Sequence, residues 1–312
     1  MINPLNLFKP YFDLTLGSKK SHITRVLERP GLWMTPQQLE NLVEDLRTVV
    51  RTLNIGELDY GIVQGSKQAL DNAVITLIYD GPTGKPFAFN ALTIMNCTVR
   101  GHAQQVVHLG LVAVDPSARA KGLSWILYGL TTFLLFIKNR FKPVWISNVT
   151  QVPAIIGMVS ESFGNVYPNP LQNTRRSYDH LVLAREITTR YRYVFGVGED
   201  AEFDEEAFVL KNAYTGGSDN LKKTFEQAPK HRNPIYNDFT KAALDYDRGD
   251  DILQLGQMDV KTYYHYMVHT IPKGSFLVLI YKVLFSCIEF SLVPVIQWFS
   301  TSKQMGSLRP RK

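Results

Sequence analysis

The fold is decided by the sequence VVHLGLVAVDP at residues 106–116 and by SARAKGLS at residues 117–124, which follows directly. The first stretch is rich in β-branched apolar residues and ends at a proline, as a buried strand does. The second is a short loop with a glycine and two basic residues, and apolar residues recur after it at helical spacing. Strand, loop and helix N-terminus form a common phosphate-binding device, because the first N–H groups of a helix and its dipole attract anions.

The loop carries the pattern Arg119-x-x-Gly122-x-Ser124. This pattern resembles the acyl-CoA pyrophosphate loop of the GNAT acyltransferase superfamily, Gln/Arg-x-x-Gly-x-Gly/Ala, with Ser124 in the last place. The resemblance implies that acyl-CoA or acetyl-CoA is the co-substrate. It also implies that backbone N–H groups at the end of the preceding strand hold the pantetheine arm and the thioester carbonyl. The cofactor-binding residues implied in this way are Val112, Ala113, Val114, Arg119, Ala120, Lys121, Gly122, Leu123 and Ser124.

Further strands are expected on both sides of the loop. Residues 73–79 and 87–95 predict a hairpin, because turn-forming residues join them. After the loop, residues 143–149 predict a strand and 154–163 a short helix, and residues 180–184 are expected to close the sheet. With the resemblance, these elements predict an α+β, GNAT-like fold: a mixed, mostly antiparallel sheet flanked by helices, plus a helical C-terminal extension with an apolar segment.

The N-terminal part predicts one long helix. The sequence Thr35-Pro36-Gln37-Gln38 is a helix start, with a threonine N-cap, a proline at the first helical position and a glutamine three residues after the cap. An apolar stripe follows it, as on a helix that packs against a sheet. Residues 1 to about 30 are expected to form an irregular arm.

The length of 312 residues allows more than one unit. We expect a GNAT-like acyltransferase domain over residues 1–190, a family-specific extension over 191–275, and an apolar membrane-associating segment with a basic tail over 276–312. This division follows the range of residues that resembles the GNAT pattern and the change of composition after residue 190.

The amino-acid composition indicates which classes of partner the protein can bind. The formal net charge of +6 suits anionic partners such as CoA phosphates or an anionic membrane surface. The sequence shows no nucleic-acid motif and no zinc-ligand spacing, so we expect no nucleic-acid partner and no metal. Its two cysteines, Cys97 and Cys287, lie in apolar runs, which favours buried thiols in a reducing compartment. The N-terminus lacks the pattern of a signal peptide, and a cytoplasmic location is therefore expected.

Residues 276–299 form an apolar segment with two charges, Lys282 and Glu289. A helix of this length could cross a bilayer. A single crossing would, however, keep the basic tail in the cytoplasm and place the upstream domain outside, away from CoA. We therefore expect peripheral or re-entrant association with the inner face of a membrane. The alternatives for this segment are a membrane-spanning helix, a helix buried in the core and a contact surface of an oligomer.

Acyl transfer from a thioester to an amine needs a neutral amine, a polarised carbonyl and a protonated leaving thiolate. Three candidates for catalytic roles are His108 as the base, Asn148 to orient substrate or water, and Tyr167 as the acid, because Met158 stands where the resemblance implies a tyrosine. The structural alternatives are a satisfied sheet histidine, a strand-end cap and core packing. The aspartates between residues 245 and 251 are expected to form a solvated turn, since their spacing does not fit a calcium loop.

The sequence thus favours an enzyme, an N-acyltransferase that moves an acyl group from acyl-CoA to an amine acceptor at a membrane surface. The acceptor is a small molecule, a lipid or a protein. One alternative is a non-catalytic membrane-associated binding or regulatory module on a GNAT scaffold. Another is an unrelated α+β protein that binds no CoA. Assembly into a homo-oligomer is left open.

Overall fold

The computed structural model describes residues 9–17, 21–54, 58, 60–118, 123, 125–172, 174–216 and 219–269. The strands are β1 (Asp13–Gly17), β2 (His22–Glu28), β3 (Ala73–Asp80), β4 (Pro86–Val99), β5 (His102–His108), β6 (Val112–Val114), β7 (Val144–Thr150), β8 (Gly164–Tyr167), β9 (Glu202–Asp204), β10 (Val209–Lys211) and β11 (Asp251–Met258). The helices are α1 (Pro36–Arg51), α2 (Gly61–Gln64), α3 (Lys67–Asn72), α4 (Thr131–Lys138), α5 (Pro153–Ser162), α6 (Tyr178–Arg190), α7 (Pro234–Ala243) and α8 (Val260–His269), with a π-helix, η4 (Trp125–Leu130), before α4 and a short 3-10 helix, η5 (Arg192–Val194), after α6.

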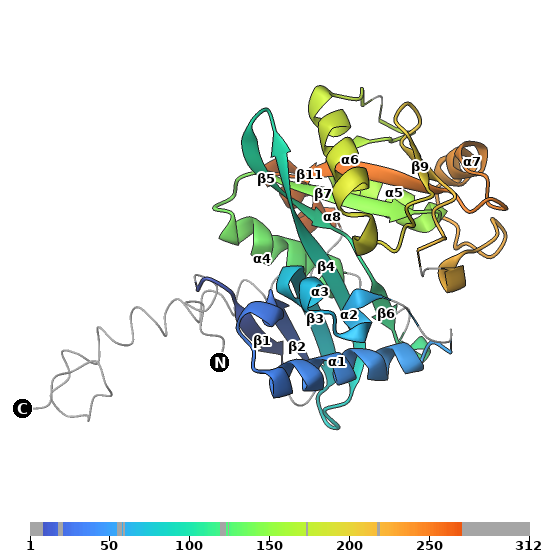
Figure 1. Cartoon of the computed structure of the whole chain (residues 1–312). Coiled ribbons are helices and arrows are strands. Elements are labelled where there is room, and N and C mark those ends of the chain that lie inside the picture. Colours follow the sequence, from blue (N-terminus) through green and yellow to red (C-terminus); the bar gives the residue numbers. More distant parts are fainter. Residues whose placement is uncertain are drawn as a thin grey trace, which may run out of the picture.

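All the described strands belong to one sheet, in the order β1-β2-β3-β4-β5-β7-β11-β10-β9 (Figure 1). β6 pairs with β4, and β8 pairs with β11. The β5–β7 pair is parallel, whereas the other pairs are antiparallel. The predicted mixed, mostly antiparallel sheet is confirmed.

Helices cover both faces of the sheet, and alternate residues of β4 pack against helices on opposite faces. Its residues Phe89 and Ala91 pack in a cluster with α1, whereas Leu92 and Ile94 pack in a cluster with α4. This alternation follows from the two-residue period of a strand. We call the side of α1, α2, α3 and α6 the α1 face, and the side of η4, α4 and α5 the α4 face.

The predicted helix start at Thr35 is confirmed. The Thr35 hydroxyl accepts a hydrogen bond from the Gln38 backbone N–H, and the Gln38 side chain accepts one from the Thr35 N–H, which together form a capping box. The helix buries Leu42, Leu46 and Val49 against the sheet. The hairpin of β3 and β4, the strand β7 and the helix α5 also lie where the sequence predicts them.

The prediction of an irregular arm over residues 1 to about 30 is wrong where the structure describes it. Residues 13–28 contain β1 and β2, which pair with each other, and β2 continues the sheet at β3. Arg25 and Asp13 form an ion pair of 2.8 Å across β1 and β2. These strands escaped prediction because β1 is a short edge strand and because polar residues alternate with apolar ones in both.

The predicted strand at residues 180–184 is also wrong, because these residues belong to α6. The Ser177 hydroxyl accepts from the His180 N–H and caps the helix. Leu183, Ala184 and Ile187 are fully buried at helical spacing on the α1 face. An apolar run of this length fits a buried strand and a buried helix equally well.

The strand that takes the expected place is β11, which pairs antiparallel with both β7 and β8. It comes from residues 191–275, the segment predicted as an extension. The sheet therefore continues across the predicted boundary at residue 190, and residues 191–250 connect α6 to a strand of that same sheet (Figure 1).

No helix in the described ranges is long and apolar enough to cross a bilayer. The apolar segment 276–299, on which the membrane prediction depends, lies outside the described residues.

Candidate functional site

A β-bulge separates β5 from β6. Thr93 of β4 lies opposite His108, yet the Ala91 N–H donates to the Leu111 carbonyl at 2.9 Å. Two steps along β4 thus correspond to three steps along the facing strand, so that the latter holds one extra residue. Gly110 fits there because an added Cβ would lie 2.4 Å from the Ala91 carbonyl oxygen. The stretch 106–116, predicted as one strand, therefore contains the end of β5 and all of β6.

Beyond the bulge, β6 and β7 diverge (Figure 1). The parallel pairing of β5 and β7 ends at His108 and Ser147, and the Leu109 N–H makes a last bond of 2.8 Å to the Ser147 carbonyl. β6 then pairs with β4 alone among the described strands, whereas β7 stays beside β11. We call the region where β6 and the C-terminal half of β7 no longer pair the strand gap.

The backbone of β6 points donors into the strand gap. Leu111 and Asp115 make their hydrogen bonds to β4. In an antiparallel pair the bonded residues alternate, so Ala113 also bonds to β4, whereas the N–H groups of Val112 and Val114 point the other way. Donors placed in this way can bind the carbonyl groups of an extended ligand.

The predicted cofactor-binding residues fall into two groups. Val112, Ala113 and Val114 form β6, and the half-buried Leu123 packs with Val112 and Val114 on the α4 face. The other predicted residues lie outside the described residues: Arg119, Ala120, Lys121, Gly122 and Ser124.

Asn148 is the first residue of β7 beyond the end of the β5–β7 pairing. It is buried, and by strand alternation it faces the α4 face together with Ile146. Its Nδ2 has no hydrogen-bond partner among the described residues. A buried amide donor without a partner is costly, and a ligand carbonyl in the strand gap would satisfy it.

His108 fits the structural alternative better than the predicted role of base. It is 2% exposed, its Nδ1 lies 3.0 Å from the Ser147 hydroxyl, and its ring packs 5.2 Å from that of Phe195. Burial lowers its pKa to about 4, so the imidazole is neutral at pH 7 and is a weak base.

Tyr167 lies away from the strand gap. It ends β8, which β11 separates from β7. Its ring packs on Phe208 at 4.8 Å, and its hydroxyl donates to the Glu206 carbonyl at 3.4 Å. The structure therefore brings Asn148 to the gap and places Tyr167 in the core.

A second polar group, which sequence reasoning missed, lies on the α1 face at the end of β7. The Tyr214 hydroxyl donates to the Asp251 carboxylate at 3.0 Å, and the Gln151 amide donates to the Tyr214 hydroxyl at 2.6 Å. The Tyr246 hydroxyl donates to the Gln151 carbonyl at 2.7 Å. We call Asp251, Tyr214, Gln151, Tyr246 and Tyr60 the Asp251 cluster.

Asp251 is buried, and desolvation raises its pKa to about 7, with a downward effect from the Tyr214 hydrogen bond and a further upward effect from Asp250. Arg248 pairs with Asp250 at 2.6 Å and neutralises it. Burial and the Asp251 carboxylate raise the pKa of Tyr60 to about 12, so this tyrosine is neutral and close to Asp251. The prediction of a solvated turn is wrong for Asp250 and Asp251, which are buried.

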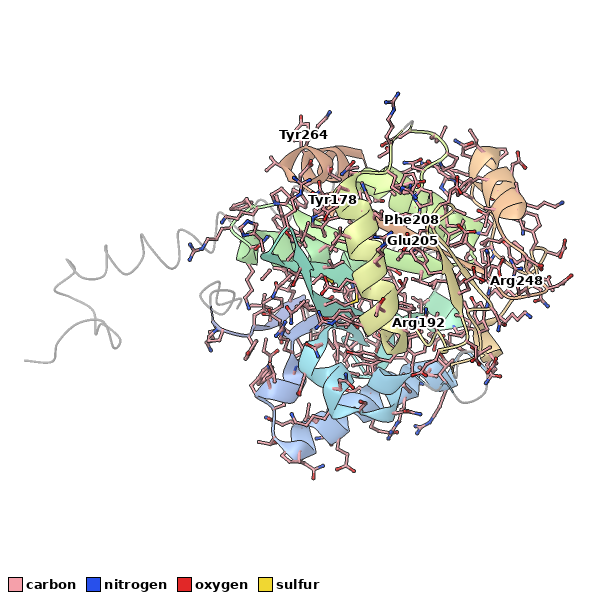
Figure 2. The ribbon with its side chains drawn as sticks, turned by 45° about the horizontal axis from the view of Figure 1, so that its top comes forward. Tyr178, Arg192, Glu205, Phe208, Arg248 and Tyr264 are labelled. Atoms are coloured by element: carbon pink, nitrogen blue, oxygen red, sulfur yellow. The ribbon has the colours of Figure 1, made fainter. Side chains whose placement is uncertain are left out.

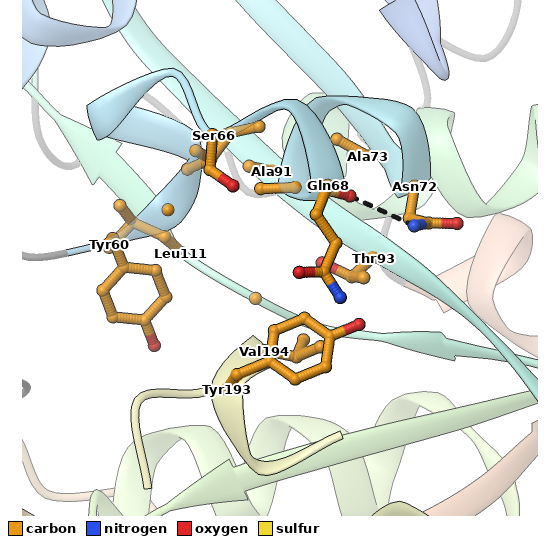
Figure 3. A pocket seen from close by; sticks show the side chains of 14 residues that line it. Tyr60, Ser66, Gln68, Asn72, Ala73, Ala91, Thr93, Leu111, Tyr193 and Val194 are labelled. Carbon is orange, nitrogen blue, oxygen red and sulfur yellow. Dashed lines mark hydrogen bonds between the residues drawn. The ribbon is translucent and has the colours of Figure 1, made fainter. Parts of the chain in front are cut away.

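A pocket opens beside the bulge on the α1 face (Figure 3). Its space of about 570 Å³ includes open solvent, and its walls come from α2, α3, β4, the bulge and η5. Figure 3 shows Tyr60 and Tyr193 on one side and Gln68 and Asn72 of α3 on the other. None of the described residues that line it carries a charge. Tyr60 both lines the pocket and belongs to the Asp251 cluster.

Arg192 fixes the segment that closes this pocket. Its guanidinium donates to the carbonyls of Gly198 at 3.2 Å, Glu199 at 2.9 Å and Ala201 at 2.7 Å. Figure 2 shows Arg192 at the end of α6, where η5 begins. These bonds anchor η5, from which the largely exposed Tyr193 lines the pocket.

In the part of the chain that the structure describes, no group of three or more His, Cys, Asp or Glu side chains could hold a metal ion. Cys97 is buried on β4, as predicted, and burial raises its pKa to about 12. Cys287 lies outside the described residues.

No known family profile and no curated protein matches the sequence. Several solved structures match part of the chain by structure. An acetyltransferase of Trypanosoma brucei is 24% identical, over 38% of this chain and 76% of that one, with a TM-score of 0.27. A ribosomal-protein-S5-alanine acetyltransferase of Vibrio fischeri is 13% identical, over 43% and 74%, with a TM-score of 0.29. AAC(6′)-Iy, solved with the bisubstrate analogue CoA-S-monomethyl-acetylneamine, is 22% identical, over 31% and 67%, with a TM-score of 0.25.

The similarity to these structures is partial and low in identity, so nothing about substrates carries over from them. The GNAT-like fold that the loop pattern implied agrees with the mixed sheet and with the helices on its two faces. The chemistry has to come from the strand gap, the pocket and the Asp251 cluster.

Proposed function

We propose that this protein is an N-acyltransferase that moves an acyl group from acyl-CoA to an amine. The observation that carries the proposal is the strand gap, with the N–H groups of Val112 and Val114 directed into it. An acyl-pantetheine arm offers amide and thioester carbonyls in a row, and strand-like hydrogen bonds to β6 are the natural way to bind such a chain.

The residues around the gap fit this substrate. The N–H groups of β6 are preorganised, because β4 holds the strand from the other side. The unpartnered Nδ2 of Asn148 adds a donor on the α4 face. Such fixed donors polarise a thioester carbonyl and stabilise the oxyanion that forms when an amine attacks it. When bound, acyl-CoA supplies the activated acyl group.

The two substrates would approach from opposite sides. The loop 119–124 precedes η4, which packs on the α4 face, so the CoA phosphates belong there. The pocket beside Tyr60 opens on the α1 face and would take the acceptor. The strand gap lies within the sheet between the two faces, and we place the attack on the thioester there.

Calorimetric titration tests the proposal, with CoA, acetyl-CoA and palmitoyl-CoA as ligands. Wild type should bind at least one of them, and Gly122→Glu should not, because bulk and charge would block the phosphate loop. Val114→Pro should weaken binding about 3- to 10-fold, because it removes one N–H that faces the gap and none that bonds to β4. Val114→Ala keeps that N–H and is the matched control.

The outcomes separate the alternatives. Binding with transfer to an amine supports the enzyme. Binding without turnover across a panel of amines favours the non-catalytic module on the same scaffold. If no thioester binds wild type, the proposal is wrong.

Membrane association stays a prediction from residues 276–299, together with a cytoplasmic location and the open question of a homo-oligomer. α8 leads toward this segment, and Tyr264 on α8 is 70% exposed. Aromatic side chains of this kind suit a membrane interface. Sedimentation of the full chain with vesicles of anionic and of zwitterionic lipid tests it: binding to anionic vesicles is expected, and a protein that stays in solution with both would contradict it.

A further inference from the structure

We propose that Asp251 is the catalytic base of this site: it accepts the proton of the acceptor, which is a primary amine with an apolar body seated in the pocket beside Tyr60. This inference rests on the proposed acyl transfer. It assigns a residue and a substrate class to a buried cluster that acyl-CoA binding alone does not explain.

The position of Asp251 supports the assignment. Asp251 begins β11, and Gln151 directly follows β7 at the end that borders the strand gap. Both lie on the α1 face, on the same side of the sheet as the pocket. Tyr60 connects them, because it lines the pocket and is close enough to Asp251 for the carboxylate to raise its pKa.

None of the groups that act on the Asp251 carboxylate is a cation that could neutralise it. The groups that act on the carboxylate are the hydroxyls of Tyr214, Tyr60 and Tyr246 and the neighbouring Asp250. The tyrosines are neutral, and Asp250 is already paired with Arg248. A carboxylate in a dry site without its own cation attracts a cationic ligand.

Gln151 supplies an independent sign of a ligand. It is 1% exposed, and its amide nitrogen donates both to Tyr214 and to the Leu221 carbonyl. Since a carbonyl can only accept, these bonds fix the orientation of the amide. The Oε1 atom is then a buried acceptor without a partner among the described residues. Asp251 and Gln151 together offer two acceptors to the N–H donors of an ammonium group.

The pocket fits the rest of the acceptor. Its walls include Tyr60, Tyr193, Leu111 and Val194, and no lining residue in the described chain is charged. A hydrophobic or aromatic body would therefore be buried there without an unpaired charge. Strongly anionic or polycationic acceptors do not fit.

The proposed step balances as follows. The ammonium gives one proton to the Asp251 carboxylate and becomes a neutral amine. Its nitrogen attacks the thioester carbonyl, the C–N bond forms, and the C–S bond then breaks. The second proton of the attacking nitrogen goes to the departing thiolate, which leaves as CoA thiol. Asp251 afterwards releases its proton to solvent. The pKa of about 7 suits a base that must be deprotonated near neutral pH and still take up a proton.

The test compares two acceptors with acetyl-CoA as donor. Benzylamine is protonated at pH 7 and needs a base, whereas hydroxylamine is largely unprotonated and does not. Asp251→Asn keeps the shape of the side chain and an oxygen for the Tyr214 hydroxyl. We expect it to lower kcat/KM for benzylamine about 100-fold or more, and to change kcat/KM for hydroxylamine less than about 5-fold.

The pH profile is the second readout. In wild type, kcat/KM for benzylamine should rise with pH through an apparent pKa near 7, and this rise should be absent in Asp251→Asn. If wild type acetylates both amines and Asp251→Asn retains both activities and the pH dependence, the assignment of the base is wrong and acyl transfer stands. If wild type binds acetyl-CoA and acetylates neither amine, the acceptor class is wrong. If wild type does not bind acetyl-CoA, the proposed function fails first.

Discussion

Two buried titratable side chains face the same side of the sheet at the strand gap, and burial affects them in opposite ways. His108 ends β5, and desolvation lowers its pKa to about 4. Asp251 begins β11, and desolvation raises its pKa to about 7. Both effects favour the neutral form. Only for the carboxyl group does this shift bring the pKa near the pH at which a base has to work.

The comparison teaches that residue type alone does not identify a base. Histidine has the more suitable ordinary pKa, and it was therefore the sequence-based candidate. In the structure His108 is held by Ser147 and Phe195 in a dry environment. Asp251 is held by a tyrosine hydroxyl beside a pocket, where a cationic substrate could approach.

The largest effect on stability is expected for Asp251→Asn. The folded-state pKa of Asp251 lies above its ordinary value of 3.8, so the native state binds more protons between pH 4 and 7. The contribution of Asp251 to the free energy of unfolding of wild type should therefore fall as pH rises through this range. The variant lacks this loss and should be about 2–4 kcal/mol more stable than wild type at pH 8, with little difference at pH 4. Urea denaturation at both pH values measures it, and equal stability at pH 8 would contradict the burial of a charged Asp251.

A change in the pH profile is expected for Tyr214→Phe. The Tyr214 hydroxyl donates to Asp251 and holds the pKa of the carboxyl down against desolvation. Without it, the rise of kcat/KM for benzylamine should move up by about 1 pH unit, which corresponds to the loss of one hydrogen bond to a charged group. An unchanged profile would show that Tyr214 does not act on the base.

The smallest effect on activity is expected for His108→Gln. The variant should keep kcat/KM for benzylamine at pH 7 within about 3-fold, with the same rise near pH 7. It should also remove the contribution of His108 to the pH dependence of stability. That contribution opposes the one from Asp251: it destabilises the fold as pH is lowered from about 6.5 toward 4, because the unfolded state takes up a proton that buried His108 does not. Loss of the rise near pH 7 in this variant would make His108 the base instead.

The sequence predicts local structure well where the signals are local. The capping box at Thr35, the turn between β3 and β4, and the helix over α5 all depend on neighbouring residues, and all are confirmed. The assignment of residues 180–184 failed because a buried apolar run has no period that separates strand from helix.

The site was harder to predict because it is assembled from distant segments. Asn148 could be found from its place near the end of a predicted strand, and the structure brings it to the gap. Asp251 could not, because its burial depends on Tyr60, Tyr214 and Gln151, which are far from it in sequence. The only local sign was an aspartate at the start of an apolar strand.

The central claim is that the outward N–H groups of β6 bind the acyl-CoA arm, and amide hydrogen exchange followed by NMR tests it most directly. Val112 and Val114 should exchange more slowly when acetyl-CoA is added, because their N–H groups face the strand gap. Ala113, between them, bonds to β4 already and should change little, which makes it an internal control. Slower exchange at Val112 and Val114 alone is the predicted result. Unchanged exchange at both residues with saturating acetyl-CoA would contradict the claim.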